Sequence, residues 1–483
     1  MKTPVTKESP APGVGFRRKN MIFGRYRRLH FVGIGGAGMS GMAEILADLG
    51  YHISGSDNNP SDVTERLSQR GIAVSSEHSA DNLSDAHLVV ISAAVDDSNP
   101  EVAEAKRRGI PVIKRAEMLG ELMRLKFSIG ISGAHGKTTT TALTGHILKC
   151  AGLDPTVIVG GRANDETLGA KVGSGDYLVA EADEYDRSFL VMYPSLAVAL
   201  NLEEDHLDCY RGLHDLKEAF CQYLNRVPFY GHVILNGDDP NLMEITPLLK
   251  RPIVTFGLGE SVDYRATDWV HLAGESSFML QRRGEPLGRL IPPLPGRHNL
   301  LNTLSAVTIA LELDVQFDAA AEALRSFTGV LRRFERRGDA GGVTVYDDYA
   351  HHPTEVRNAL EAARQFDRPL TVIFQPHLFS RTRDFAGGFA DALAVADRVI
   401  LVDIYPARER PIEGVTSRLI FDEAARRDFV QFSYVGELSN AVDTAVSRAS
   451  ANEVIFTMGA GDVCRLCPLI IEGLTARAGG GET

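Results

Sequence analysis

The segment from Phe127 to Thr141, FSIGISGAHGKTTTT, carries residue types that could hold the phosphates of a nucleotide. Its apolar first half predicts a strand, its glycines predict a tight turn, and the apolar spacing after the turn predicts a helix. Backbone N–H groups at a helix start face an anion, a lysine such as Lys137 reaches the β- and γ-phosphates, and a hydroxyl such as that of Thr138 can hold Mg²⁺. The chemistry predicted for this segment is therefore the binding of ATP or GTP.

The glycine spacing of this phosphate loop departs from the usual P-loop pattern. Only two residues separate Gly133 and Gly136, whereas the usual pattern has four. A purely structural alternative is a strand followed by a helix that Thr138 caps. Four consecutive threonines count against this alternative, because β-branched residues are poor helix formers. The loop residues predicted to contact the nucleotide are Gly133, Ala134, His135, Gly136, Lys137, Thr138 and Thr139.

A second glycine loop lies near the start of the chain, where His30 to Gly38 reads HFVGIGGAG. The apolar residues before Gly33 predict a strand, and GxGxxG followed by helical spacing is typical of a nucleotide-binding βαβ unit. The next predicted strand ends at Asp57, where this fingerprint has the acid that binds a ribose. An NAD-dependent dehydrogenase, a protein that binds another nucleotide diphosphate and a plain strand-turn-helix all fit these residues.

Carboxylates and one histidine follow two further predicted strands. Residues 176–181, DYLVAE, end in Glu181 and lead into more acidic residues, and the strand over 196–201 leads into LEEDHLDCY, which contains His206. Ligands bind at the carboxyl ends of parallel strands, so both side chains are candidates for metal ligands. The structural alternatives are a solvated acidic loop for Glu181 and an ordinary structural histidine for His206.

The elements predicted to position these residues alternate between strands and helices. This order indicates an α/β fold with a Rossmann-like N-terminal domain, a central P-loop-type ATPase domain with a mostly parallel sheet, and a doubly wound C-terminal domain. Residues 252–294 alternate apolar and polar side chains between glycine turns, which predicts antiparallel strands. A helix is predicted from Pro295 to Leu311, and in the C-terminal domain we expect strands at 343–346, 370–374, 398–402 and 453–458 and helices at 353–364 and 385–394.

Size and composition fit a protein of several domains that binds small molecules. The chain has 483 residues, so two to four domains are expected, and its net charge of -12 argues against general binding to nucleic acid or anionic membrane. Five mostly scattered cysteines favour a reducing compartment, and no uncharged apolar span is long enough to cross a membrane. We therefore expect a cytoplasmic monomer or dimer without membrane insertion, with a disordered tail over residues 1–26.

Taken in order, the motifs of the chain resemble those of the Mur ligases, from about Leu29 onward. The motifs that carry the resemblance are HFVGIGGAGMSGMA, SGAHGKTTTT, EADE, NLEEDHLD, PGRHNLLN, RRFE, DDYAHHP, FQPHLFSRTRD and DIYPARE. The resemblance implies a UDP-sugar-binding domain, here residues 27–123, a central ATP-binding domain, 124–331, and a C-terminal domain that brings the amino acid, 332–483. The chain departs from the family pattern at Ala134, where threonine is usual, and at Leu378, where a basic residue is common.

The resemblance also implies an activity. It implies an ATP-dependent ligase that joins L-alanine to the lactyl carboxylate of UDP-N-acetylmuramate through an acyl phosphate, in peptidoglycan precursor synthesis. ATP is then a substrate, and two Mg²⁺ ions are the implied cofactor. The residues implied as catalytic are Lys137, Glu181, His206, His351 and Arg381, and those implied as metal ligands are Thr138, Glu181 and His206.

The remaining candidates follow from the same resemblance. Beyond the phosphate loop, the residues implied to bind ATP are His298, Asn299, Asn302, Arg333 and Asp348. The residues implied to bind the UDP-sugar are Gly33, Gly35, Gly36, Gly38, Asp57, His78 and Ser92. The residues implied to bind the amino acid are Tyr349, His351 and Arg381.

Other functions share part of this pattern. A recycling ligase that adds a tripeptide to UDP-N-acetylmuramate would share most motifs, an NAD-dependent oxidoreductase would explain only the first glycine loop, and a non-catalytic nucleotide-binding scaffold would not need the metal and phosphate candidates. The spread of candidates over three domains further predicts that the third domain closes over ATP. The hinge is expected near residues 328–331, where Gly329 supplies backbone freedom, after a helix that ends near Phe327.

Overall fold

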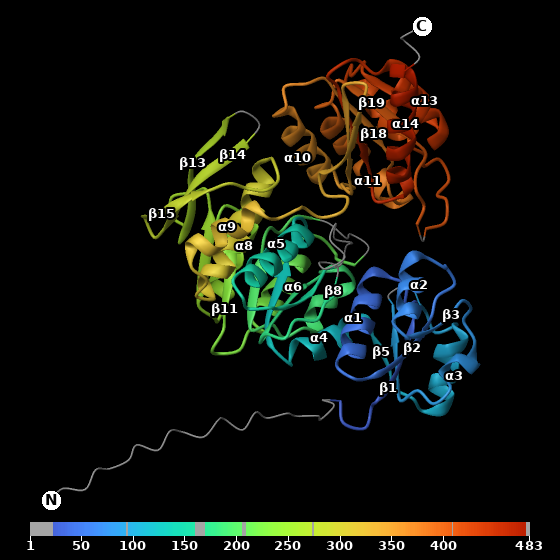
Figure 1. Cartoon of the computed structure of the whole chain (residues 1–483), viewed down its shortest axis with the longest axis vertical. Helices are drawn as coiled ribbons and strands as arrows, with labels where there is room; N and C mark the ends of the chain where they lie inside the picture. Colours follow the sequence, from blue (N-terminus) through green and yellow to red (C-terminus); the bar gives the residue numbers. More distant parts are fainter. Residues whose placement is uncertain are drawn as a thin grey trace, which may run out of the picture. The chain divides into compact units, whose positions relative to one another are not determined.

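The computed structural model describes residues 23–92, 95–159, 170–204, 209–272, 275–407 and 409–479. The chain divides into two compact units, of which the first runs to Gly35 and continues from Ala43 to Ile113, and the second comprises Gly36–Met42 and the chain from Lys114 onward. Three sheets form within the described residues, one in the first unit and two in the second (Figure 1). The predicted α/β class with three sheet-based domains is confirmed.

The first unit has a five-stranded sheet in the order β3-β2-β1-β4-β5. Strand β1 pairs in parallel with both β2 and β4, so the strand order reverses beside β1, and the glycine loop follows β1 at this point. In open α/β sheets such a reversal is where ligands bind. The elements are β1 (Arg28–Val32), α1 (Ala37–Asp48), β2 (His52–Ser56), α2 (Asp62–Gln69), β3 (Ala73–Ser75), η1 (Ala80–Leu83), β4 (Leu88–Ile91), α3 (Pro100–Arg108) and β5 (Val112–Lys114).

The first of the two sheets in the second unit has ten strands, in the order β15-β14-β13-β12-β11-β10-β6-β9-β7-β8. Its central strands are parallel. The antiparallel pairing predicted for 252–294 is found between β13 and β14 and between β14 and β15, whereas β12 is parallel to both of its neighbours, so the prediction was wrong for that strand. The elements are α4 (Arg115–Met123), β6 (Phe127–Ser132), α5 (Lys137–Cys150), β7 (Thr156–Ile158), β8 (Ala170–Lys171), β9 (Tyr177–Glu181), η2 (Tyr185–Val191), β10 (Leu196–Ala199), α6 (Leu213–Leu224), β11 (His232–Asn236), α7 (Pro240–Ile245), η3 (Thr246–Leu248), β12 (Ile253–Gly257), β13 (Tyr264–Leu272), β14 (Glu275–Arg282), β15 (Glu285–Leu290), α8 (Arg297–Glu312) and α9 (Phe317–Arg325).

Strand β6 carries the phosphate loop and is buried on both faces. Ile129 and Ile131 belong to the large core that the strands share with α5, α8 and α9. On the opposite face the strand carries Gly130. A larger residue does not fit there, because a Cβ atom on Gly130 would lie 2.3 Å from the hydroxyl of Tyr223. A strand that is packed from both sides gives the loop at its end a fixed position.

The third sheet has six strands in the order β16-β17-β21-β18-β19-β20. Strand β16 is antiparallel to β17 and the other pairs are parallel. One core packs α10, α11 and α12 against the sheet and a second core packs α13 and α14, so the sheet is doubly wound. The elements are β16 (Glu335–Ala340), β17 (Val343–Asp348), α10 (Pro353–Arg364), β18 (Leu370–Phe374), α11 (Phe379–Leu393), β19 (Arg398–Val402), α12 (Arg418–Arg426), β20 (Phe432–Gly436), α13 (Leu438–Arg448), β21 (Val454–Met458), η4 (Asp462–Arg465) and α14 (Leu466–Gly479).

Some sequence predictions need correction. The helix expected from Phe385 begins at Phe379, and the non-helical backbone at Phe385 marks a kink between its two parts. Helix α9 ends at Arg325, two residues before Phe327, and Gly329 has a positive φ of 95°. Most of the tail predicted over residues 1–26 lies outside the described residues. Among the residues that the structure describes, no helix combines the length and apolar character needed to cross a bilayer.

A buried carboxylate organises the first unit. The side chain of Glu101, at the start of α3, accepts hydrogen bonds from Ser56 (2.6 Å) and Asn82 (2.7 Å) and lies 3.1 Å from Nδ1 of His78 and 3.4 Å from Nε2 of His30. Burial alone would raise the pKa of Glu101, but the hydrogen bonds from these neighbours lower it to about 2. The carboxylate therefore joins α3 to strands β1 and β2 as a charged group.

We expect Glu101→Gln to destabilise the protein by about 1.5–3 kcal/mol, because a charged acceptor is lost from a buried network. The depressed pKa means that the carboxylate stabilises the fold above its ordinary pKa of 4.5 and stops doing so as the pH falls towards 2. Thermal unfolding should therefore show a difference between wild type and variant at pH 7 that shrinks towards pH 2. The exposed Glu65→Gln serves as control, and equal melting of all three proteins at pH 7 would contradict the assignment.

Candidate active site

The phosphate loop has the predicted strand-turn-helix form. Strand β6 ends at Ser132 and α5 begins at Lys137, with the backbone in the positive φ region at Gly133 (φ 135°) and Gly136 (φ 85°). Gly136 is the N-cap of α5, so the alternative in which Thr138 caps the helix is wrong. A Cβ atom on Gly136 would lie 2.3 Å from Oδ1 of Asn302, which leaves room only for glycine. Because glycine has no side chain, no side chain at the N-cap position accepts a hydrogen bond from the first N–H groups of α5.

Lys137 is held among carboxylates at the edge of the sheet. Its Nζ donates to the carbonyl of Gly133 (2.7 Å) and to both carboxylate oxygens of Glu184 (2.8 and 3.0 Å), and it lies 3.9 Å from Asp183. Burial would lower the pKa of Lys137, but Glu184 and Asp183 outweigh this effect and raise the pKa above its ordinary value. The loop therefore holds a permanent positive charge beside the helix start.

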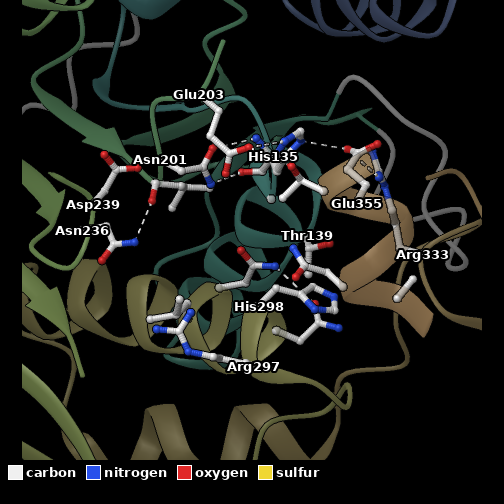
Figure 2. Close-up of a pocket in the computed structure, with 18 of the residues that line it drawn as sticks. His135, Thr139, Asn201, Glu203, Asn236, Asp239, Arg297, His298, Arg333 and Glu355 are labelled. Carbon is white, nitrogen blue, oxygen red and sulfur yellow. Dashed lines mark hydrogen bonds and ion pairs between the residues drawn. The ribbon is translucent and has the colours of Figure 1, made fainter. Parts of the chain in front are cut away.

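One cavity of about 360 Å³ lies beside the phosphate loop and is drawn in Figure 2. It brings together loop residues, the first turn of α8 and residues of the third sheet domain, which are far apart in the sequence. We call it the first cavity. Among the predicted ATP contacts, those that line it are His135, Gly136, Thr138, Thr139, His298, Asn299, Asn302, Arg333 and Asp348.

The asparagines in the first turn of α8 brace that turn, and Asn302 also accepts a hydrogen bond from the hydroxyl of Thr140 in α5 (3.4 Å). Asn299 donates to the carbonyl of Pro295 (2.8 Å), and Asn302 donates to Oδ1 of Asn299 (3.2 Å). Burial lowers the pKa of His298 to about 4, so its ring is neutral at pH 7. A neutral imidazole beside amides can contact a heterocyclic base by stacking and hydrogen bonding without a charge penalty.

The residues around Arg333 have an unusual backbone. Arg332 and Phe334 both have positive φ, of 58° and 51°, and they flank Arg333 on either side. Asp348 holds this turn, because its carboxylate accepts hydrogen bonds from the backbone N–H groups of Phe334 (2.7 Å) and Ala350 (2.8 Å). Burial raises the pKa of Asp348 to about 6. Such strained conformations cluster at binding sites, where the surrounding structure holds them.

A second cavity of about 780 Å³ lies on the other side of the loop. It is lined by Lys137, Thr138 and Glu181 from the central part of the chain and by Tyr349 and His351 from the third sheet domain. Several arginines that the sequence motifs did not indicate also line it. These arginines are Arg115, Arg332, Arg337 and Arg465. The second cavity therefore suits an anionic ligand.

The predicted amino-acid contacts lie near one another. The rings of Tyr349 and His351 are 5.2 Å apart in an edge-to-face arrangement. Burial lowers the pKa of His351 to about 4, and the positive charge of Arg381 also lowers it. Arg381 is buried in the first turn of α11, near enough to His351 to influence its charge. The structure therefore groups these three side chains, although Arg381 does not line the second cavity.

The two cavities meet at the phosphate loop. Gly136 and Thr138 of the loop line both of them, and so do Arg333 and Glu355 of the third sheet domain. A phosphoryl group at the start of α5 would thus be reachable from either cavity. This shared wall is the geometric feature that a transfer between two ligands requires.

The first glycine loop, which follows β1, is braced by Asp57. Gly35 donates its backbone N–H to Oδ2 of Asp57 (2.8 Å), and Asn59 donates to Oδ1 of the same side chain (3.0 Å). A Cβ atom on Gly33 would lie 2.8 Å from Oγ of Ser92, and His78 lies 2.8 Å from the hydroxyl of Ser56. Gly36 accepts the first hydrogen bonds of α1. Asp57 thus shapes the loop, a role that the fingerprint alone did not indicate.

The candidate metal ligands are only partly described. Thr138 and Glu181 line the second cavity together, with a hydroxyl and a carboxylate oxygen that suit Mg²⁺. His206 lies outside the described residues. A different group, His135, Glu203 and His352, offers three ligand atoms within 4.8 Å of one another. His135 of this group already lies between two carboxylates, those of Glu203 and Glu355.

Three carboxylates at the loop were missed as site residues. Glu184 pairs with Lys137, while Glu203 and Glu355 lie 3.5 and 3.3 Å from the ring nitrogens of His135. Each of them falls inside or just beyond a motif already noted, EADE, NLEEDHLD and DDYAHHP. Their positions along the chain were therefore visible in the sequence, but only the folded structure shows that all three carboxylates lie at the phosphate loop.

Comparison with known proteins agrees with this architecture. Family models described as "Mur ligase family, catalytic domain", "Mur ligase middle domain" and "Mur ligase, glutamate ligase domain" match residues 28–127, 131–310 and 332–461. The UDP-N-acetylmuramate--L-alanine ligase of Geotalea daltonii is 45% identical over 454 residues, which cover 94% of this chain and 99% of that protein.

Two solved structures are similar over most of the chain. The UDP-N-acetylmuramate-alanine ligase MurC from Thermotoga maritima has a TM-score of 0.79 at 31% identity, with 93% of this chain and 99% of that chain covered. The murein peptide ligase mpl from Psychrobacter arcticus has a TM-score of 0.69 at 24% identity, with 93% and 99% covered, and this similarity shows the fold. From the order of its three matched domains and the extent of these similarities, the chain belongs to the Mur ligase family.

Proposed function

We propose that this protein is an ATP-dependent ligase that joins L-alanine to the lactyl carboxylate of UDP-N-acetylmuramate, in peptidoglycan precursor synthesis. The observation that carries the proposal is the pair of cavities that share the phosphate loop as a wall. ATP would lie in the first cavity, with its base near His298 and its γ-phosphate at Lys137. The carboxylate and the amino acid would approach from the second cavity.

The reaction would proceed in two transfers. An oxygen of the lactyl carboxylate attacks the γ-phosphorus of ATP, ADP leaves, and an acyl phosphate forms. The amine of L-alanine then attacks the acyl carbon, phosphate leaves, and the amine loses a proton as the amide forms. Phosphoryl transfer depends mainly on positioning and on stabilisation of charge, which the fixed charges of Lys137 and Arg333 would supply.

The neutral state of His351 suits the amino-acid side of the site. Because its pKa is lowered to about 4, the imidazole is uncharged at neutral pH and can accept a proton or a hydrogen bond from an ammonium group. Arg381 would meet the carboxylate of L-alanine, since a guanidinium binds carboxylates through paired hydrogen bonds. Tyr349 would cover the same ligand.

Magnesium fits the donors of the second cavity. Thr138 and Glu181 would hold one Mg²⁺, and His206 would help to hold a second. The ion would supply charge stabilisation on the transferring phosphoryl group. Thr138 stands in the first turn of α5 and Glu181 at the end of β9, both of which are fixed by the central sheet.

The first glycine loop and the residues near it would bind the diphosphate and uridine of the UDP-sugar, with Gly33, Gly35, Gly36, Gly38, Asp57, His78 and Ser92 as the contacts. We further propose domain limits of 27–123, 124–331 and 332–483, a cytoplasmic location, where ATP is available, and a monomeric or dimeric state.

The experiment that tests the proposed function measures ADP and phosphate release with UDP-N-acetylmuramate present. We expect release that requires L-alanine and yields one amide per ATP. A preference for the tripeptide over L-alanine would identify a recycling ligase instead, and turnover of NAD without ATP consumption would identify an oxidoreductase. Binding of nucleotides without turnover of any substrate would identify a non-catalytic nucleotide-binding scaffold.

Removal of the loop lysine should abolish the reaction. Lys137→Ala is expected to lower kcat by a factor of at least about 10³, because the positive charge at the γ-phosphate is lost. The exposed Lys149→Ala, at the other end of α5, is the matched control.

Lys137→Ala also removes the ion pair between Lys137 and the buried Glu184, which lowers stability. The double variant Lys137→Met with Glu184→Gln removes both charges and separates this effect from catalysis. Activity of the double variant within a few-fold of wild type, in steady-state kinetics, would rule out the role of Lys137.

Loss of a metal ligand should appear in the magnesium dependence. Glu181→Ala is expected to shift the Mg²⁺ concentration for half-maximal rate upward by about tenfold or more, since a charged ligand is removed. Asp176→Asn, at the exposed start of the same strand, should leave the midpoint unchanged. A titration of rate against Mg²⁺ that gives one midpoint for all three proteins would contradict the assignment.

A further inference from the structure

The first turn of α10 touches the phosphate loop from the third sheet domain. Oε1 of Glu355 lies 3.3 Å from Nδ1 of His135 in the loop, and the hydroxyl of Thr354 donates to Oε2 of Glu203 (2.9 Å). The rings of His135 and His352 lie 5.0 Å apart. Figure 2 shows His135 between the two carboxylates that come from opposite sides. Two sheet domains of the second unit are thus joined at one histidine.

Glu355 uses its two carboxylate oxygens for different partners. Oε1 faces His135 and lies 3.8 Å from a guanidinium nitrogen of Arg333, on the side of the first cavity. Oε2 accepts the backbone N–H of His351 (3.0 Å) and lies 3.3 Å from Nδ1 of that ring. The carboxylate lines both cavities, and its side chain is only 12% exposed. One buried group therefore contacts the loop on one side and the proposed L-alanine contact on the other.

We propose that Glu355 is a positioning residue that couples nucleotide at the phosphate loop to L-alanine at His351, by pairing with His135. A shift of His135 when the loop receives phosphate changes the position of Glu355, and Glu355 fixes the backbone and ring of His351. The inference rests on the proposed function, since it takes ATP and L-alanine as the two ligands.

The charges around His135 agree with this arrangement. Burial would lower the pKa of His135, but the carboxylates of Glu203 and Glu355 raise it to about 9. Burial would raise the pKa of Glu355, but His351, His135 and Arg333 hold it well below its ordinary value. Of the other rings near His135, that of His352 lies 5.0 Å away and that of His298 is neutral at pH 7. The pair of His135 and Glu355 is therefore ionic at pH 7.

Ionic pairing sets a pH range for the coupling. The pKa of His135 is raised by its partners, so the pair is fully formed below the ordinary pKa of 6.5 and is lost as the pH rises through about 9. A merely structural contact elsewhere on α10 would not give this dependence. The coupling should consequently weaken between pH 7 and pH 9.5.

The test is a binding measurement on the full-length protein. With UDP-N-acetylmuramate present, the Kd of L-alanine is measured by calorimetry with and without a non-hydrolysable ATP analogue, and the ratio of the two values is the coupling factor. Typical allosteric factors are about 5 to 150, and the wild type should fall in this range at pH 7. In Glu355→Gln and in His135→Gln the factor should fall to within about twofold of one.

Further variants show whether the effect is specific. Glu355→Asp keeps the charge and should recover part of the coupling, and Arg357→Gln, on the exposed side of α10, should match wild type. In the double variant of His135 and Glu355, the loss should be no larger than in either single variant, because both act through one pair. If Glu355→Gln fails to fold, His135→Gln and the wild-type dependence on pH decide the question.

The outcomes separate this inference from the proposed function. L-alanine binding to wild type with an unchanged coupling factor in both single variants, or losses that add in the double variant, would overturn the coupling role alone. A wild-type factor that stays constant from pH 7 to 9.5 would do the same. No binding of L-alanine to wild type would overturn the proposed function and this inference with it.

Discussion

Two positive charges on a short glycine loop are kept inside the protein by carboxylates, and the rest of the site depends on this arrangement. Lys137 faces Glu184, and His135 lies between Glu203 and Glu355. Removing either charge from water would be unfavourable without such partners. The loop is therefore charged and ordered before any phosphate reaches it, which is the condition for effective electrostatic stabilisation of a transferring phosphoryl group.

The same arrangement explains why the site needs more than one domain. Strand β6 and helix α5 fix the loop, α8 supplies Asn302 against Gly136, and the third sheet domain supplies Arg333 and Glu355. The overall charge of the chain is -12, yet arginines collect around the second cavity. Attraction of an anionic substrate is thus a local property of this cavity, and the net charge gave no sign of it.

Sequence patterns predicted the fold well where the signal is local. The glycines of both loops, the apolar strands and the alternation of residues 252–294 led to the correct elements. The start of α11 was misplaced because its first turn, Phe379 to Asp384, is polar and separated from the rest by a kink, so that helical spacing begins clearly only after Phe385.

The site was predicted less completely, for a physical reason. Lys137 and Asn302 stand in motifs that can be recognised along the chain, whereas Glu355 matters because tertiary structure brings it to within 3.3 Å of a residue 220 positions earlier, at His135. Asp57 shows the converse case. The fingerprint marked it as a ligand contact, and in the structure one carboxylate oxygen accepts a backbone hydrogen bond from Gly35 in the loop and the other accepts one from Asn59 in the turn after β2.

The central claim is that one phosphoryl group passes from the first cavity to a carboxylate in the second. It is tested most directly with UDP-N-acetylmuramate in which both oxygens of the lactyl carboxylate are ¹⁸O, incubated with ATP and L-alanine, and with mass spectrometry of the phosphate released. An acyl phosphate made by attack of that carboxylate on ATP predicts one ¹⁸O atom in every phosphate and one retained in the amide carbonyl. Phosphate free of ¹⁸O, released together with ADP and the amide product, would contradict the account.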